Sequence, residues 1–341
     1  MEIKKQTITR ALRIFLGITV LSMAVVLGLT VRGETWVALR ELKPTYFGLT
    51  LLVILAYLYF ECLRLQVLAS GLGKWISFRS SAEFTIGGIF LTITPLGIAG
   101  LPLQLYVLNR EGMGIGRGTS VIIMRAAITF LIVPFFLPFV FIYSQESFSH
   151  GLIGGLIKYV IIIATALLIL GLLVTLRPPH RVRKFLHRFV KSDRGRNWVD
   201  KIMQEIIHLK EAIKDYGRQG KLRLFGAFLL TFVARGLFFL FPYTLLRGLN
   251  LNPPLIQTMM IQVVYSCVLL YMPTPGASGI AEAAGMGLYS AVCPKHLLGV
   301  FVLLWRFFSP YIGMMIGAFL VLRLVSGIGN EKNKTITPNT K

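Results

Sequence analysis

The sequence predicts an all-α polytopic membrane protein with about six full spans and two re-entrant broken hairpins arranged as an inverted repeat. The chain has 341 residues, of which 55% are hydrophobic and only 15% charged, and its mean hydropathy is +0.71. A soluble domain is typically about one quarter charged. So many apolar side chains exceed what one soluble core of this length can bury, so we expect most of them to face lipid.

Six apolar segments are long enough to cross about 30 Å of hydrocarbon. They are 14–31, 46–62, 119–143, 152–176, 224–247 and 296–322. The first segment follows a basic N-terminus and resembles a signal peptide. It is as long as a full span, however, and no small-residue cleavage site follows it, so we expect it to be a membrane anchor.

Two further apolar regions, 83–108 and 255–292, are interrupted in the middle by glycine and proline. We interpret each as two half-helices that meet at a broken turn. The residues that define the breaks are Pro95, Gly97 and Gly100 in the first region and Pro275, Gly276 and Gly279 in the second. Non-helical backbone at membrane depth is tolerated only where protein or a water-filled cavity shields its amides. Two such breaks therefore predict a polar cavity near the midplane.

The distribution of lysine and arginine predicts the orientation of the chain, because these residues gather on the cytoplasmic side. Basic residues occupy the N-terminus and the tail. They also occupy two predicted loops, one with Arg64, Lys74 and Arg79 and the other with Arg110 and Arg117. With these on the cytoplasmic side, region 83–108 begins and ends in the cytoplasm, whereas region 255–292 begins and ends outside. Both termini are then cytoplasmic, in an inner membrane.

The formal net charge of +22 has two explanations, nucleic acid and anionic lipid. The hydrophobic content favours anionic membrane lipids as partners and argues against nucleic acid. The sequence leaves open whether the chain forms homo-oligomers.

The two halves of the chain share a pattern. Thr94 and Pro95 before Gly100 resemble Thr274 and Pro275 before Gly279. Arg125 follows Pro95 by 30 residues and Arg306 follows Pro275 by 31, each within the next apolar span. Since the two breaks enter from opposite sides, this pattern is typical of the inverted repeats of transporters.

We expect a single transmembrane domain over residues 1–325 and a disordered cytoplasmic tail over 326–341. The first half covers about 14–176 and the second 224–325. The connector, 177–223, has 14 Lys/Arg and 5 Asp/Glu and is too polar to span. Its apolar residues recur at helical spacing and predict an amphipathic helix along the cytoplasmic surface: Trp198, Ile202, Ile206, Leu209, Ile213 and Tyr216.

Ionisable side chains inside a membrane cost at least about 2.5–3.5 kcal/mol, so a functional role is the first hypothesis for each of them. The candidates for substrate binding are Arg125, Arg235, Arg306 and Glu282, with Gln104 and Tyr271 as polar lining. Glu61 and Arg64 lie near a span end. Three arginines at one cavity favour a headgroup with phosphate, because the guanidinium fork matches phosphate oxygens. The alternative is that the arginines pair with Glu61, Glu282 or open backbone carbonyls.

No catalytic residues, metal site or cofactor are predicted. The three cysteines form no CxxC pair, the five histidines lack metal-ligand spacing, and no P-loop, HExxH, GxSxG or dinucleotide-binding glycine pattern is present. The sequence therefore favours a protein that is not an enzyme.

Two stretches carry a resemblance to a known family. MPTPGASGIAEAAG with the later LLWRFF, and TPLGIAGLPLQLYVLNREG with IIMRAA, resemble the transmembrane region of lysylphosphatidylglycerol synthases. The resemblance covers roughly residues 10–325. That region also occurs as stand-alone, flippase-like membrane proteins. Leu101 and Gln104 stand where family members often have a Gly-Glu pair and a basic residue.

This resemblance implies a lipid-translocating membrane domain with two re-entrant regions in an inverted arrangement. It carries over to Pro95, Gly100, Arg125, Pro275, Gly279, Glu282 and Arg306. The aminoacylating members have a separate soluble transferase domain, whose activity we do not carry over to this chain.

From these observations we expect a flippase-like transporter that moves a phospholipid or isoprenoid-linked lipid across the cytoplasmic membrane. Two alternatives remain. One is a non-transporting accessory subunit of a lipid- or glycan-modifying enzyme. The other is a membrane-embedded lipid transferase, for which Glu282 lacks an obvious catalytic partner.

Overall fold

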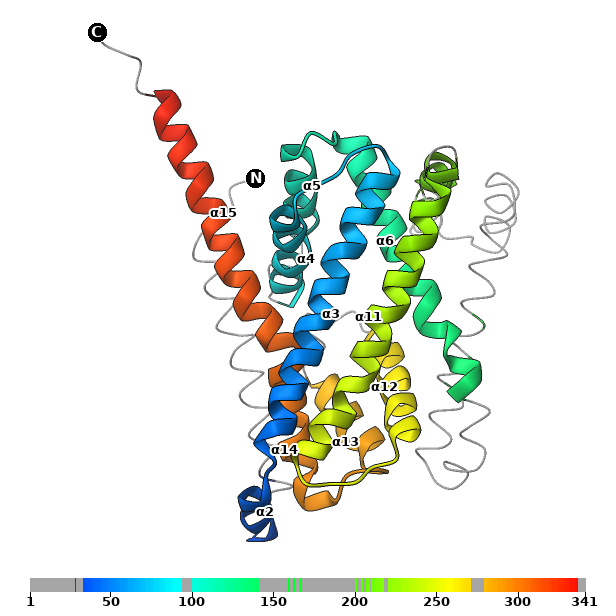
Figure 1. Ribbon diagram of the computed structural model, residues 1–341, viewed down its shortest axis with the longest axis vertical. Helices are drawn as coiled ribbons and strands as arrows, with labels where there is room; N and C mark the ends of the chain where they lie inside the picture. The colour runs from blue at the N-terminus through cyan, green and yellow to red at the C-terminus, as the bar shows by residue number, and fades with distance from the viewer. Residues whose placement is uncertain are drawn as a thin grey trace.

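The computed structural model of the protein describes the ranges 33–93, 100–140, 210–217, 220–270 and 279–336, and the single positions 28, 159, 162, 166, 200, 204, 207 and 208. Within these residues the chain is a bundle of helices (Figure 1). Four helices are long and apolar enough to cross a membrane: Pro44–Gly71, Ile115–Val140, Lys221–Gly248 and Lys295–Leu324. They match four of the six predicted spans. The other two, 14–31 and 152–176, lie outside the described residues except at 28, 159, 162 and 166.

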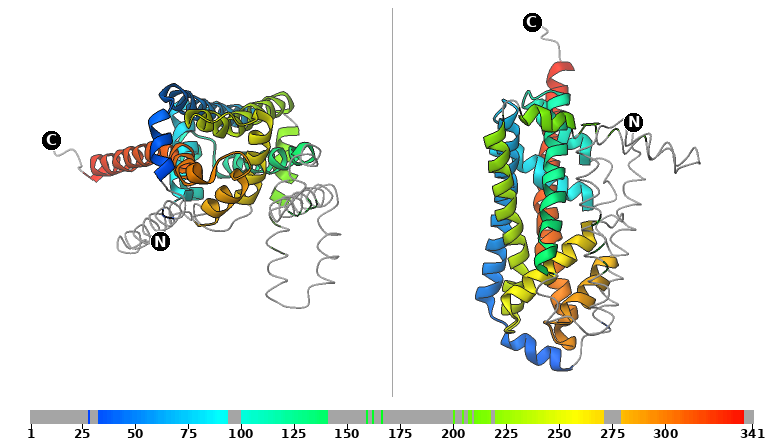
Figure 2. Two further views of the ribbon diagram at one scale, coloured as in Figure 1. Left: turned by 90° about the horizontal axis from the view of Figure 1, so that it is seen from below. Right: turned by 90° about the vertical axis from the view of Figure 1, so that its right-hand side faces the viewer.

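Two helices of 28 residues each lie along one side of the bundle: α3, Pro44–Gly71, and α11, Lys221–Gly248 (Figure 2). They run antiparallel and side by side in both views (Figures 1 and 2). Near one end the hydroxyl of Thr50 donates to that of Thr244 at 2.9 Å. At the other end a Cβ on Gly220 would lie 2.7 Å from the carbonyl oxygen of Gly71, so only glycine fits there. The pair is therefore in close contact over its whole length.

Two pairs of shorter helices lie near opposite ends of α3 and α11 (Figures 1 and 2). At the end where α3 finishes lie α4, Phe78–Ile93, and α5, Gly100–Arg110. At the end where α11 finishes lie α12, Leu255–Leu270, and α13, Ile280–Tyr289. At 1.5 Å per residue these helices measure about 24 Å or less, which is shorter than the hydrocarbon layer. The residues between the helices of each pair, 94–99 and 271–278, lie outside the described residues.

A cluster of polar side chains joins the start of α4 to the end of α5. The buried carboxylate of Glu83 accepts hydrogen bonds from Arg79 at 3.1 Å and Arg110 at 2.5 Å. The hydroxyl of Ser80 donates to Glu111, which follows α5, and accepts from Arg110 at 2.9 Å. These bonds hold the start of α4 against the end of α5.

The last span is built from three helical pieces: α14, Lys295–Arg306; η4, a π-helical turn at Phe307–Tyr311; and α15, Ile312–Ile336. The π turn contains Pro310, which has no amide hydrogen to donate to the helix ladder. Beyond it α15 packs against α4, where a Cβ on Gly317 would lie 2.4 Å from the carbonyl oxygen of Ile86. Residues 326–336, which we predicted to be disordered, continue α15 as helix.

Two smaller elements and α6 complete the described bundle. Helix α2, Gly33–Ala38, and the 3-10 turn η1, Leu39–Glu41, precede α3, whereas α6, Ile115–Phe135, follows α5. The hydroxyl of Thr35 in α2 donates to the carbonyl of His296 at 2.7 Å, while Trp36 is exposed. An exposed tryptophan at the end of a bundle is typical of a membrane–water interface.

The described part of the predicted connector, 210–217, is helical. Ala212 and Tyr216 are fully buried there, and the Tyr216 hydroxyl donates to the carbonyl of Leu68 at 2.9 Å. Ile213, which we predicted on the same apolar face as Tyr216, is exposed. The buried face thus follows an i, i+4 spacing through Ala212 and not through Ile213. The other predicted members of the face lie outside the described residues.

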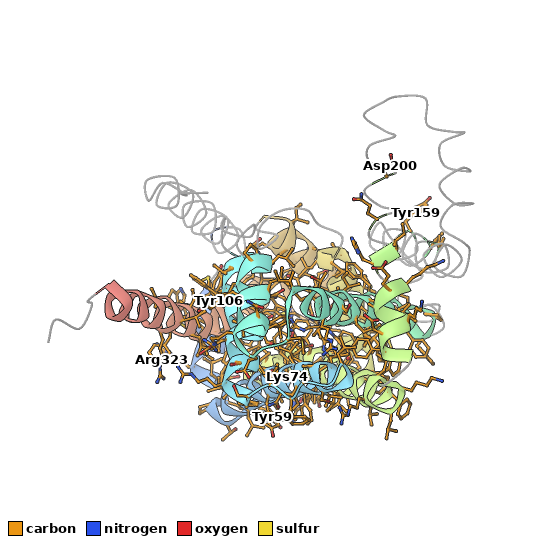
Figure 3. The ribbon with its side chains drawn as sticks, turned by 90° about the horizontal axis from the view of Figure 1, so that it is seen from above. Tyr59, Lys74, Tyr106, Tyr159, Asp200 and Arg323 are labelled. Atoms are coloured by element: carbon orange, nitrogen blue, oxygen red, sulfur yellow. The ribbon has the colours of Figure 1, made fainter. Side chains whose placement is uncertain are left out.

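Basic residues gather at the end of the bundle where α3 finishes, as predicted for one membrane face. Figure 3 looks down on this end, with Lys74 over the end of α3 and Arg323 on α15. Arg79, Arg110 and Arg117 lie on the adjoining ends of α4, α5 and α6. Arg64 does not belong to this set. It lies inside α3 with a buried side chain, so its assignment to a cytoplasmic loop was wrong.

The contact between α15 and α4 generates a first prediction. Gly317→Ala places a methyl group against the backbone of Ile86, and overpacking of this kind costs about 1–3 kcal/mol. We expect a lower midpoint of thermal unfolding in detergent. The matched control is Gly48→Ala in α3, where the new methyl group meets no atom within 4 Å and helix propensity improves by about 0.5–1 kcal/mol. Equal midpoints for the two variants would contradict the close packing of α15 on α4.

Candidate functional site

Three arginines from three membrane-spanning helices meet at one carboxylate, that of Glu61. Glu61 and Arg64 come from α3, Arg125 from α6 and Arg235 from α11. Glu61 Oε2 lies 2.9 Å from Arg64 Nη2 and 3.0 Å from Arg125 Nη2. Glu61 Oε1 lies 3.5 Å from Arg235 Nη2. We call these four residues the Glu61 cluster.

The sequence brings these residues together by helical periodicity. Glu61 and Arg64 are three residues apart, so they project from neighbouring positions on the same side of α3. Arg64 Nη1 also donates to Thr129 Oγ1 at 3.1 Å and to Thr231 Oγ1 at 3.4 Å, on α6 and α11 respectively. Each of the three helices therefore contributes both a charged and a hydroxyl group, or two charged groups, to one buried contact.

The members of the Glu61 cluster differ in exposure. The side chains of Glu61 and Arg64 are each 2% exposed, whereas those of Arg125 and Arg235 are 18% and 15% exposed. Arg64 is thus enclosed by protein, whereas the side chains of Arg125 and Arg235 keep some exposed surface in the described part of the chain. A ligand would therefore approach Arg125 and Arg235 first.

Aromatic rings flank both accessible arginines. The guanidinium carbon of Arg235 lies 5.9 Å from the ring centroid of Tyr57 and 6.0 Å from that of Phe238. That of Arg125 lies 5.4 Å from the ring of Phe84. Cation–π attraction stabilises each arginine by roughly 0.5–2 kcal/mol and orients its plane. The rings hold these two side chains in place without occupying their hydrogen-bond donors.

The Glu61 cluster has more positive charge than its own acid can balance. Three guanidiniums and one carboxylate leave a net charge of +2. Several buried polar atoms also lack a hydrogen bond among the described residues: Glu61 Oε1 and the Nε atoms of Arg64, Arg125 and Arg235. An unpaired arginine at the centre of a membrane helix costs about 2.5–3.5 kcal/mol on insertion scales. Such an arrangement is stabilised by an anion that accepts hydrogen bonds.

A second charged pair lies in the other half of the chain. Arg306, the last residue of α14, donates through Nε to Glu282 Oε1 at 2.9 Å, and its Nη2 lies 2.9 Å from the same oxygen. The other carboxylate oxygen of Glu282 accepts from the backbone amide of Gly279 at 2.6 Å. Gly279 has φ of 87°, a left-handed conformation that favours glycine. Glu282 therefore caps the first turn of α13 and ties it to α14, and this pair is neutral.

A buried amide lies near this second pair. Gln262 Oε1 accepts hydrogen bonds from the hydroxyl of Tyr289 and from Trp305 Nε1, the latter at 3.2 Å. The hydroxyl of Tyr265 donates to the carbonyl of Ala281 at 3.0 Å. These bonds connect α12, α13 and α14 without a net charge. They account for the burial of polar groups here by packing alone.

The structure separates the arginines that we predicted at one cavity. Arg125 and Arg235 meet at Glu61, whereas Arg306 pairs with Glu282. Gln104 belongs to α5, and its side-chain amide packs over Gly88 of α4. Gly100 opens α5, and Gly279 precedes α13. The other predicted site residues lie outside the described residues: Tyr271, Pro95, Gly97, Pro275 and Gly276.

The sequence analysis named Glu61 and Arg64 but assigned them no role in binding. Their three-residue spacing within an apolar helix was the available signal, since such a pair shares one helix side. No pattern indicated that Arg125 and Arg235 would reach the same carboxylate, because that depends on how α6 and α11 pack on α3.

Comparison with known sequences agrees with the helical architecture. Residues 14–317 match the sequence family described as the lysylphosphatidylglycerol synthase transmembrane region. The chain belongs to this family. It is also 25% identical over 307 residues to a protein of Archaeoglobus fulgidus named "UPF0104 membrane protein". The aligned residues make up 87% of this chain and 92% of that relative. No solved structure matches. The resemblance to this family that we predicted from the motifs around the two Gly/Pro interruptions is confirmed.

The Glu61 cluster generates a second prediction. Glu61→Gln leaves three buried guanidiniums without their carboxylate, and removal of one partner from a buried ion pair costs about 3–5 kcal/mol. We expect a clear fall in the midpoint of thermal unfolding in detergent. Adding Arg64→Gln to this variant removes one unbalanced charge, so the double variant should recover part of the loss.

The control for this experiment is Glu34→Gln, because the side chain of Glu34 is 77% exposed and its only described ion pair is the 3.5 Å contact with His296. This variant should unfold at the wild-type temperature. If Glu61→Gln behaved like Glu34→Gln, the cluster would make no contribution to holding the three helices together.

Proposed function

We propose that this chain is a flippase-like transporter that moves a phospholipid or an isoprenoid-linked lipid across the cytoplasmic membrane. The headgroup enters a polar cavity near the midplane while the tails stay in the lipid. In this proposal the chain is not an enzyme, and it lacks an ATP-binding motif, so movement is passive or driven by an ion gradient.

The observation that carries the proposal is the excess positive charge of the Glu61 cluster. Glu61 is the eighteenth of 28 residues in α3, so the cluster lies well inside the spanning part of that helix. Arginine presents a planar fork of donors that matches phosphate oxygens. Two of the three arginine side chains, those of Arg125 and Arg235, keep accessible surface. A lipid headgroup with a phosphate supplies both the negative charge and the acceptors that these groups lack.

The pairing of helix lengths supports an inverted repeat with two re-entrant hairpins. The series α3, α4 and α5 has 28, 16 and 11 residues, and the series α11, α12 and α13 has 28, 16 and 10. The two series start at opposite ends of the bundle (Figure 1). Inverted repeats of this kind place the substrate site of transporters between the two halves. In this proposal α4–α5 enters from the basic, cytoplasmic side and α12–α13 from the other side.

The second charged pair has a different role in the proposal. Glu282 caps α13 and holds Arg306 of α14, so α13 cannot move away from α14 without breaking this pair. At the other end, Glu83 holds the bases of α4 and α5 together. Each short-helix pair thus moves as a unit with its neighbours, which limits the motions that open the cavity to one side.

Loss of one accessible arginine should impair translocation. We expect Arg235→Gln or Arg125→Gln to slow movement of a fluorescent anionic phospholipid in liposomes by about tenfold or more, since hydrogen bonds to charged groups contribute about 1.5–3 kcal/mol. The rate is measured by chemical quenching of the label in the outer leaflet. The control is Arg117→Gln, which removes an exposed charge from the same helix as Arg125.

Unchanged rates in Arg125→Gln and Arg235→Gln would contradict the proposal, provided that the variants retain the wild-type thermal midpoint. Absence of translocation by the wild-type protein across several anionic lipids would favour the accessory-subunit alternative.

Cysteine accessibility tests the proposed re-entrant arrangement. In a background without Cys62, Cys267 and Cys293, we expect Lys74→Cys and Ile115→Cys, which flank α4–α5, to react with an impermeant thiol reagent from the cytoplasmic face. Asn252→Cys and Ala291→Cys, which flank α12–α13, should react from the opposite face. If the two positions that flank one pair reacted from different faces, that pair would cross the membrane and the re-entrant interpretation would be wrong.

A further inference from the structure

The net charge of the Glu61 cluster constrains the charge of the anion that it would bind, because among the residues that the structure describes no other acid forms an ion pair with its arginines. The predicted spans outside the described residues, 14–31 and 152–176, contain no Asp or Glu, and neither do residues 94–99 and 271–278. Glu282, in the short helix α13, is paired with Arg306. The cluster therefore keeps its charge of +2 unless a ligand supplies the compensation.

Glu83, the remaining acid of the short helices, is committed elsewhere. Its two carboxylate oxygens accept from Arg79 and Arg110 at the base of α4 and α5, where both arginines are partly exposed. The arginines that act electrostatically on Glu61 are those of its own cluster. Glu83 thus belongs to a separate, surface-connected network.

We propose that the Glu61 cluster selects a lipid headgroup with two negative charges, a phosphate monoester or a diphosphate, over a phosphodiester with one. This inference rests on the proposed function in taking a lipid headgroup as the occupant. A dianion brings the site to zero net charge, whereas a monoanion leaves one guanidinium uncompensated in a medium of low dielectric constant. A zwitterionic headgroup leaves both charges uncompensated.

The hydrogen-bonding geometry points the same way. Arg125 and Arg235 lie on different helices and contact different oxygens of Glu61, and each has an Nε atom without a hydrogen-bond partner among the described residues. A terminal phosphate offers three unsubstituted oxygens that accept hydrogen bonds. A phosphodiester offers only two such oxygens, because two of its four carry substituents. The terminal group therefore satisfies more of the donors in the cluster.

The test compares two lipids with identical acyl chains, phosphatidic acid and phosphatidylglycerol, binding to the full chain in detergent. Affinities are measured by titration with each lipid at pH 7.5 and pH 5.5. We expect phosphatidic acid to bind about tenfold or more tightly at pH 7.5. The second pKa of a phosphate monoester is about 6, so the preference should shrink at pH 5.5, where the headgroup carries mostly one charge.

Phosphatidylglycerol serves as a control for titration of the protein, because its own charge does not change between pH 5.5 and pH 7.5. Any change in its affinity over this range would come from the protein. Among the described residues, the titratable groups that interact with the arginines of the cluster are Glu61 itself, Tyr57 and Cys62, all on α3. A pH effect equal for both lipids would come from the protein and would overturn the assignment of the change to the ligand.

Two variants separate charge from folding. Arg235→Gln lowers the net charge to +1 and should remove most of the preference, whereas Arg235→Lys keeps the charge and should keep the preference. Arg117→Gln, outside the cluster, should bind like the wild type. Equal affinity for the two lipids in the wild-type protein at pH 7.5 would overturn the inference. So would inorganic phosphate that binds as tightly as phosphatidic acid, because the ligand would then be a soluble anion.

The outcome is distinguishable from a failure of the proposed function. Equal binding of both lipids together with translocation of both would sink the inference and leave the transporter intact. Selective binding of phosphatidic acid without translocation of either lipid would support the headgroup preference and contradict transport.

Discussion

The ion pairs between the carboxylate of Glu61 and three arginines are the interaction on which the rest of the membrane-spanning architecture depends. This carboxylate is the meeting point of arginines from α3, α6 and α11, and it lies inside the apolar part of the bundle. Without it, three guanidiniums would face one another in a medium that does not screen their repulsion. Even with the carboxylate of Glu61, the three guanidiniums leave the cluster with a net charge of +2. The same residues thus link three helices and carry a net charge of +2, which the headgroup of the proposed lipid substrate would balance.

The two halves of the chain solve the problem of buried charge differently. In the second half the carboxylate of Glu282 matches one arginine and one backbone amide, and Gln262 satisfies nearby hydroxyl and indole donors. The Glu282–Arg306 pair is neutral. The Glu61 cluster carries a net charge of +2, and the side chains of two of its three arginines, Arg125 and Arg235, are partly exposed. This difference in charge balance is the reason why we propose the Glu61 cluster, and not the Glu282–Arg306 pair, as the binding site.

Much of this arrangement follows from sequence pattern, and the rest depends on packing. Apolar segments of span length predicted the four described spans, and the Gly and Pro interruptions predicted short helices on either side of 94–99 and 271–278. The spacing of apolar residues in the connector was less informative, because Ile213 is exposed and Ala212, a small residue, is buried. Arg64 was misplaced because the apolar run ends near it, although α3 continues for seven residues beyond it to Gly71.

Pairing between distant charges could not be predicted in the same way. Sequence pattern identified Arg125, Arg235, Arg306 and Glu282 as ionisable groups within apolar segments, but not which acid each would contact. That choice is set by the register of α6 and α11 against α3, which depends on close contacts such as that of Gly220 with Gly71. These contacts involve small side chains that leave no recognisable periodicity. The site is therefore a property of the packed bundle.

The most direct test of this account is a structure of the protein determined in a bilayer that contains a lipid with a terminal phosphate and heavy-atom-labelled tails. The account predicts phosphate density within hydrogen-bonding distance of Arg125 and Arg235, with the tails leading from there into the lipid. Arginines of the Glu61 cluster fully paired within the protein, with the labelled lipid bound elsewhere, would contradict it.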